Sequence, residues 1–261
     1  MSRKSARAQD SPAPRAKGRK EGRRQAPLAP QAPPPPQVFI SHMALEEELA
    51  RAFAEWIKRA YAAGTIEVFV SSLIPPGKNW LKELEEALAS SQLFLVLCSR
   101  VSVCSPWVLY EVGAGSGKGV LILPVCHGGL APGNIPEPLG FFESMSLADS
   151  KFTVELLDSI SKTTGLRVLP GTDHASMHAS LSQAAGDVEV KVGTLSAIAA
   201  EPKFAWRSVL RLAEKVGTTE VAMKQHLQFL EDKDYVRPGN LLRGGKGYSL
   251  TPRGHRLLSC L

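Results

Sequence analysis

Short apolar runs alternate with longer amphipathic segments between residues 37 and 168. The apolar runs predict buried strands at 37–41 (QVFIS), 66–72 (IEVFVSS), 93–99 (LFLVLCS) and 120–125 (VLILPV), with a weaker strand near 141–147 (FFESMSL). Amphipathic spacing predicts helices at 43–64, 80–91, 105–119 and 151–165. Buried strands that alternate with helices are typical of a parallel sheet covered on both faces. We therefore expect a doubly wound, flavodoxin-like α/β domain at residues 37–168.

This fold class also predicts where a ligand would bind. Open parallel sheets bind ligands outside the carboxyl ends of their strands, at the point where the strand order reverses. The loops that follow residues 40, 70 and 98 are therefore the expected positions of a site.

One carboxylate stands among apolar and small residues in the stretch 105–115, SPWVLYEVGAG. Ser105 and Pro106 are residue types preferred at the N-cap and at the first position of a helix. Trp107 and Glu111 are then four residues apart, on one face of that helix. A lone glutamate on a helix is usually only solvated, so the spacing alone leaves packing and chemistry both open.

The rest of the chain follows a different pattern. Residues 169–189 are rich in small and polar types and indicate a linker that could contain a short helix. His174 and His178 are four residues apart in this segment, but no third ligand accompanies them, so we predict no metal site. Residues 190–261 predict a second domain with helices at 194–202, 205–217 and 219–235, followed by two short strands within 235–251.

Charge is unevenly distributed along the 261 residues, whose net charge is +6. Lys and Arg exceed Asp and Glu by 7 in residues 1–36 and by 6 in residues 190–261, whereas the segment between them is acidic. Residues 1–36 also contain few large apolar residues and end in a run of prolines, which predicts a disordered tail. The tail is either a basic arm for nucleic acid or a membrane surface, or a solubilising leader.

Composition argues against several other classes of protein. No apolar run reaches the roughly 18 residues of a membrane span, and the N-terminus lacks the apolar stretch of a secretory signal. The four cysteines form no CxxC pair and no metal-ligand spacing. The sequence predicts a cytoplasmic protein with reduced thiols, a sizeable core, and no membrane, metal or cofactor requirement.

Four motifs, QVFISH, IPPGKNW, LVLCS and SPWVLYEVG, occur in an order and spacing that resemble a prokaryotic Toll/interleukin-1 receptor (TIR) domain. The resemblance covers residues 37–168. In members of this family that break down NAD, a tryptophan followed four residues later by a glutamate marks the helix that carries the catalytic carboxylate. The resemblance implies that Glu111 is this carboxylate, and that residues 72–79 form the mobile loop that gates the site and mediates contacts between domains.

A single carboxylate is sufficient for this chemistry. The nicotinamide of NAD is positively charged before it leaves, so no general acid has to protonate it, unlike the leaving group of an ordinary glycoside. The carboxylate of Glu111 could bind the ribose hydroxyls and stabilise the oxocarbenium-like charge that develops as the bond breaks. We expect further contacts with the nucleotide from residues after the strands, in the loop and on the same helix: Ser41, His42, Ser71, Ser72, Lys78 and Trp107.

The family pattern is incomplete in two places. An acidic residue that is common after the first strand is missing from SHMALEEE unless Glu46 substitutes for it, and Val108 stands where a cysteine often follows the tryptophan. His42 and Lys78 also have structural interpretations, as a hydrogen-bonding residue at a strand end and as a solvated loop residue.

The predicted second domain resembles a winged helix-turn-helix domain, and its ending YSLTPRGHRLL is similar to that of bacterial transcription regulators. The resemblance implies that the third helix enters the major groove while the wing contacts phosphates, through Lys224, Gln225, Gln228, Arg243 and Lys246. Glu220, Glu231 and Asp232 place negative charge near that helix, and winged helices also bind proteins. Nucleic acid and protein therefore both remain candidate partners.

Two classes of function follow. In the first, the protein cleaves NAD as its substrate, forms linear or cyclic ADP-ribose, and acts in signalling or antiphage defence when its TIR domains associate as a homo-oligomer. In the second, it is a non-catalytic adaptor or a DNA-binding regulator that uses the TIR surface only for association. Glu111 favours the first class.

Overall fold

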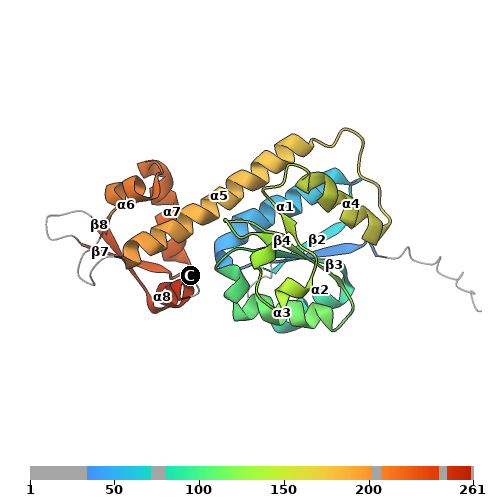
Figure 1. Ribbon diagram of the computed structural model, residues 1–261, viewed down its shortest axis with the longest axis horizontal. Coiled ribbons are helices and arrows are strands. Elements are labelled where there is room, and N and C mark those ends of the chain that lie inside the picture. The colour runs from blue at the N-terminus through green and yellow to red at the C-terminus, as the bar shows by residue number, and fades with distance from the viewer. Residues whose placement is uncertain (1–33, 72–79, 201–206, 241–245, 260–261) are drawn as a thin grey trace, which may run out of the picture. The chain divides into compact units, whose positions relative to one another are not determined.

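Five parallel strands form the central sheet, in the order β2-β1-β3-β4-β5 (Figure 1). The computed structural model describes residues 34–71, 80–200, 207–240 and 246–259. The strands are β1 (Gln37–Ser41), β2 (Glu67–Val70), β3 (Ser91–Cys98), β4 (Leu121–Cys126) and β5 (Met145–Ser146). This strand order is that of flavodoxin-like sheets, so the predicted doubly wound α/β fold is confirmed. The strand order reverses between β1 and β3, whose carboxyl ends are adjacent.

Alternate residues of each strand bury against opposite layers of helices. The helices are α1 (Glu47–Ala60), α2 (Trp80–Ser90), α3 (Pro106–Ser116) and α4 (Phe152–Thr164). On β1, Val38 and Ile40 pack in the core with α1 and α4, whereas Phe39 packs in the core with α2 and α3. Both faces of the sheet are apolar because both are covered, which explains the continuous apolar runs in the sequence.

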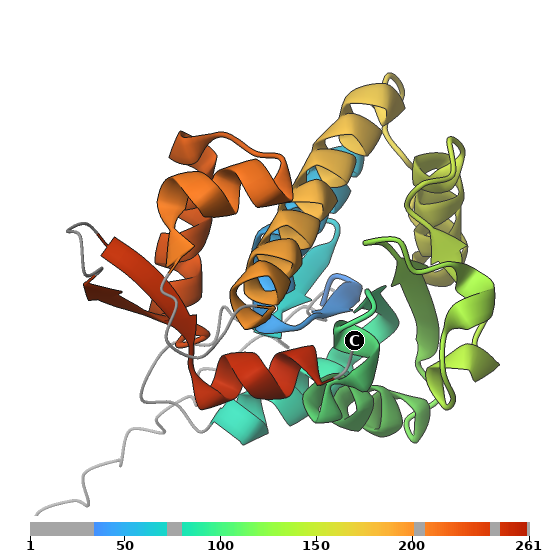
Figure 2. The same ribbon diagram turned by 60° about the vertical axis from the view of Figure 1, so that its left-hand side comes forward.

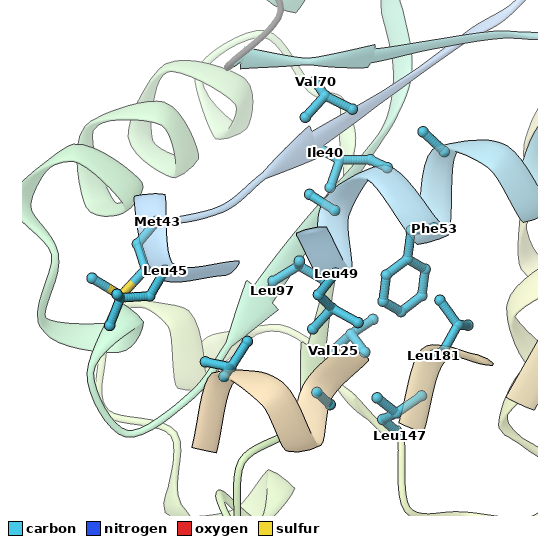
Figure 3. Close-up of a cluster of buried hydrophobic side chains, with 14 of the residues drawn as sticks. Ile40, Met43, Leu45, Leu49, Phe53, Val70, Leu97, Val125, Leu147 and Leu181 are labelled. Atoms are coloured by element: carbon cyan, nitrogen blue, oxygen red, sulfur yellow. The ribbon is translucent and has the colours of Figure 1, made fainter. Parts of the chain in front are cut away.

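The larger core layer joins the sheet to a fifth helix, α5 (His174–Ala199) (Figure 3). Leu49 and Phe53 of α1, Val125 of β4 and Leu181 of α5 are fully buried in this layer. The chain after Pro34 forms one compact unit, Pro35–Leu261.

The helix α5 differs from the linker expected at residues 169–189. It is a single helix of 26 residues that continues through the boundary predicted between residues 189 and 190. Asp173 caps it by accepting a hydrogen bond from the backbone N–H of Ser176. The sequence of α5 shows no clear helical period, because different parts of the helix bury against different elements, first α1 and α4, then α6 and α7.

The elements after α5 pack around its second half (Figure 2). They are β6 (Arg207–Ser208), α6 (Val209–Val216), α7 (Glu220–Asp232), β7 (Val236–Asn240), β8 (Lys246–Leu250) and α8 (Pro252–Leu258). The three strands form an antiparallel sheet in the order β6-β8-β7. We call residues 207–259 the C-terminal module. The domain boundaries given above stay a prediction.

Candidate functional site

Glu111 is the centre of a buried polar group on α3. Its side chain has no solvent-exposed area. One carboxylate oxygen, Oε1, accepts a hydrogen bond of 2.7 Å from the indole N–H of Trp107, one helical turn earlier. The other, Oε2, accepts a hydrogen bond of 2.5 Å from the hydroxyl of Ser41 at the carboxyl end of β1. The carboxylate is thus fixed by one local and one long-range donor.

The local part of this geometry follows from how α3 begins. Ser105 is the N-cap residue, and its hydroxyl accepts from the backbone N–H of Val108, while Pro106 occupies the first turn. Pro is suited to this position because its missing N–H would have no partner inside the helix. Starting the helix here brings Trp107 and Glu111 onto one face, as predicted.

Burial dominates the electrostatics of Glu111. It raises the pKa of the carboxyl from its ordinary 4.5 to about 7, although the hydrogen bonds from Ser41 and Trp107 act in the opposite direction. Val108 and Val112, on the same helix, are buried as well. A carboxyl group with this pKa exchanges its proton near neutral pH, in the range where many catalytic groups titrate.

A second buried carboxylate lies at the carboxyl ends of β1, β3 and β4. Glu46, in the 3-10 turn Ala44–Glu46 after β1, is fully buried. Its Oε1 lies 3.0 Å from Nε2 of His127 and accepts a 2.6 Å hydrogen bond from the hydroxyl of Ser99. Its Oε2 accepts from the backbone N–H of Met43 at 3.0 Å. We call Glu46, Ser99 and His127 the strand-end cluster.

The two carboxylates have opposite electrostatic environments. Burial opposes ionisation of Glu46 too, but the hydrogen bond and charge of His127, with the bonds from Ser99 and Met43, outweigh it and lower the pKa of Glu46. Glu46 is therefore ionised at neutral pH, whereas Glu111 titrates there. The Nδ1 atoms of His42 and His127 are buried, and neither has a hydrogen-bond partner among the described residues.

Comparison with known proteins decides the family of this segment. Residues 38–160 match the family model described as "TIR domain". Residues 38–160 therefore form a TIR domain. The chain is also similar to the TIR domains in the activated Roq1 resistosome that directly recognises the pathogen effector XopQ. That similarity has 19% sequence identity and a TM-score of 0.31, and it covers 57% of this chain and 83% of the other. A search among curated proteins gave no match.

The TIR domain brings together three of the predicted site residues, Ser41, Trp107 and Glu111. His42 follows Ser41 and is buried, and burial lowers its pKa. Ser71 is buried after the end of β2. Ser72 and Lys78 lie outside the described residues, as does the loop 72–79 to which they belong. The contacts of these last residues with a nucleotide stay predictions.

Sequence reasoning missed the strand-end cluster of the TIR domain. The topological rule that selected Ser41 would also have selected Ser99, which follows β3, and His127, which follows β4. From the sequence, Glu46 is a candidate only as a substitute for a missing family residue. Its burial and its bond to the N–H of Met43 show that it stabilises the turn after β1.

His174 and His178 attach α5 to the TIR domain. The Nδ1 atom of His174 lies 3.2 Å from the hydroxyl of Thr153, and the Nε2 atom of His178 lies 2.7 Å from the carbonyl oxygen of Leu147. Across the described parts of the chain, no three His, Cys, Asp or Glu side chains are grouped so that they could hold a metal ion. In the same parts, no helix combines the length and apolar character needed to cross a membrane.

The polar face predicted for the third helix of the second domain lies on α7. Lys224, Gln225 and Gln228 are all exposed. Lys224 forms an ion pair with Glu220 at 2.8 Å, and Gln228 donates to Asp232 at 2.8 Å. Arg243 lies outside the described residues, and for Lys246 only the backbone, at the start of β8, is described.

Proposed function

We propose that the TIR domain cleaves the bond between nicotinamide and ribose in NAD, with Glu111 as the catalytic carboxylate. The observation that supports this proposal is the placement of Glu111. It is a buried carboxylate beside the carboxyl end of β1, at the strand-order reversal where open α/β sheets bind ligands, and both of its oxygens are oriented by donors.

The chemistry requires a negative charge held in a low-dielectric site. As the bond from C1 of the ribose to the nicotinamide nitrogen breaks, the electron pair leaves with the nicotinamide, and positive charge develops on the ribose. A carboxylate fixed in apolar surroundings stabilises that charge more strongly than one in water. Water then bonds to C1 and releases a proton to the solvent, or, for a cyclic product, a ring nitrogen of the adenine bonds to C1.

Both oxygens of Glu111 are occupied by protein donors. A ribose hydroxyl that binds the carboxylate therefore replaces or shares the hydrogen bond from Ser41 or from Trp107. Ser41 and Trp107 act as positioning residues in this proposal, because they determine where the carboxylate lies before substrate arrives. His42, Ser71, Ser72 and Lys78 are proposed to contact the rest of the dinucleotide.

The decisive experiment measures nicotinamide release from NAD by concentrated protein, beside Glu111→Gln and a control variant, Glu55→Gln, on the exposed side of α1. Release that Glu111→Gln abolishes and Glu55→Gln retains supports the proposal. Because the ionised form acts, kcat/KM should rise with pH and level off above about 7. Absence of release at every protein concentration would leave the adaptor function as the better account.

We further propose that TIR domains of separate chains associate, and that the outer edge of β4 takes part. The strand β5 pairs only with Val125 and Cys126, so within the described ranges no strand pairs with Leu121–Leu123 on that side. Phe141 beside this edge is 71% exposed, and residues of both segments line a cavity of about 820 Å³. An exposed apolar patch beside an unpaired strand edge is typical of an interaction surface.

Association predicts that specific activity increases with protein concentration. The variant Phe141→Glu should lower this increase without affecting folding, because Phe141 is a surface residue. Val154→Glu, on the exposed side of α4, is the matched control. Specific activity that stays constant over a wide dilution series contradicts association as a requirement.

For the C-terminal module, we infer a winged helix fold that binds nucleic acid. The support is the order of α6, α7 and the β7–β8 hairpin, the exposed polar face of α7, and the +6 balance of residues 190–261. Exposed pairs such as Lys224 with Glu220 contribute little free energy, so Lys224 remains able to contact a phosphate.

Binding to duplex DNA should then weaken steeply as salt increases, because phosphate contacts release counterions. Lys224→Gln should weaken binding and reduce the salt slope by about 1, the contribution of one phosphate contact. Lys162→Gln on α4 serves as a control for the lost charge. Binding that neither salt nor Lys224→Gln changes would favour a protein partner.

A further inference from the structure

Three consecutive glutamates, Glu46, Glu47 and Glu48, lie where the turn after β1 meets α1. Each of them contacts a different part of the molecule. Glu46 accepts the hydrogen bonds of the strand-end cluster. Glu47 pairs with Lys233, just after α7, at 2.6 Å. Glu48 pairs with Lys191 of α5 at 2.5 Å. A short segment at the start of α1 thus carries contacts with the sheet and with the C-terminal region.

Lys191 is an unusual residue in this connection. Its side chain is 1% exposed, whereas that of Glu48 is 56% exposed. The ammonium group also lies 4.2 Å from the ring centroid of Phe229 on α7. A buried ammonium group is tolerated only when its charge is compensated, so the packing of the second half of α5 and of α7 beside α1 depends on Glu48.

The same segment holds the turn that presents Ser41. Glu46 accepts from the backbone N–H of Met43, two residues after Ser41. Ser41 in turn donates to Glu111, whose side chain is fully buried with both oxygens engaged. In this arrangement a ribose hydroxyl has no free access to the carboxylate. Residues 41–48 therefore include both Ser41, which donates to Glu111, and the glutamates that make the contacts at the start of α1.

We propose that Glu47 and Glu48, with Lys233 and Lys191, form a latch through which the C-terminal module and the second half of α5 hold the TIR site closed. While the latch is engaged, the turn 41–46 is fixed and Ser41 stays on Glu111. When the C-terminal module and the second half of α5 are drawn away from α1, the turn relaxes and the carboxylate becomes accessible to substrate. The effect on catalysis rests on the proposed NAD cleavage. The latch itself rests only on the ion pairs of Glu47 with Lys233 and of Glu48 with Lys191.

Charge reversal at the exposed partner tests the latch. Glu48→Lys places two ammonium groups together and should loosen the second half of α5 and α7 from α1. Adding Lys191→Met to Glu48→Lys removes the repulsion and keeps an apolar stem against Phe229, which should restore docking. Glu55→Lys, on the same helix but 66% exposed and paired with Arg59 of that helix, is the control.

Two readouts separate the latch from the reaction. Hydrogen exchange of the amides in residues 41–48 should become about tenfold faster in Glu48→Lys, return toward the parent value in the double variant, and stay unchanged in Glu55→Lys. Nicotinamide release from NAD should increase by about tenfold in Glu48→Lys alone, within the range of typical coupling between sites.

The outcomes distinguish the two proposals. If exchange follows the expected pattern but no variant cleaves NAD, the latch holds and the proposed function fails. If the parent cleaves NAD and Glu48→Lys changes neither exchange nor rate, the function holds and the latch is overturned. A faster rate that the double variant does not reverse also overturns it, because the effect then does not come from the pair.

Discussion

The raised pKa of Glu111 predicts how the free energy of unfolding depends on pH, whether or not the protein has enzymatic activity. Its folded-state pKa of about 7 lies above its ordinary value of 4.5, so the folded protein binds the proton more tightly than the unfolded chain. Stability is then favoured at low pH and decreases as pH rises from about 4.5 to above 7. A shift of this size corresponds to about 3 kcal/mol, at about 1.4 kcal/mol for each pKa unit.

The variant Glu111→Gln removes this loss because it cannot ionise. Its amide oxygen can still accept from Trp107, and its N–H can donate to the Ser41 hydroxyl, so it imitates the protonated carboxyl. We expect the variant and the parent to differ by less than about 1 kcal/mol at pH 4.5, whereas at pH 8 the variant should be more stable by about 3 kcal/mol.

The measurement is the free energy of unfolding from chemical denaturation at several pH values between 4.5 and 8.5. Glu55→Gln, an exposed glutamate of α1, controls for the loss of one negative charge. Parallel pH dependence of the parent and Glu111→Gln would refute the reasoning, since it would mean that burial does not raise the pKa of this carboxyl.

Three further predictions concern single residues. Trp107→Phe removes the indole donor of Glu111 and should cost about 1 to 2 kcal/mol of unfolding free energy above pH 7, with a smaller loss at pH 5, where Glu111 is protonated. Glu46→Gln should lower the free energy of unfolding by about 3 kcal/mol at pH 7, because it removes the charge of one partner in the buried pair of Glu46 with His127. The depressed pKa of Glu46 means that this difference, measured by denaturation across pH, shrinks as pH falls through that pKa. Gly254→Ala should lower the melting temperature or broaden the thermal unfolding transition, because its methyl group would collide with the backbone carbonyl of Tyr235. A melting curve like that of the parent would contradict this.

Features that depend on neighbouring residues could be predicted from the sequence. The strands are short and almost wholly apolar because the sheet is covered on both faces, and this composition is visible without a structure. The start of α3 follows from Ser105 and Pro106, and four-residue spacing then brings Trp107 to Glu111. The fold class and the local half of the site were accessible for this reason.

Features that depend on chain segments far apart in sequence required the tertiary structure. Ser41 reaches Glu111 across 70 residues, and Glu46 reaches His127 across 81, because the sheet order places the ends of their strands together. The burial of Lys191 against Glu48 likewise depends on how α5 packs on α1. Sequence by itself determined the strands and helices of residues 37–168 and which carboxylate stands on an apolar helix, but not the helix α5. Only the packing of these segments decided that Ser41 donates to that carboxylate and that Lys191 pairs with Glu48, because burial and charge pairing arise where distant elements meet.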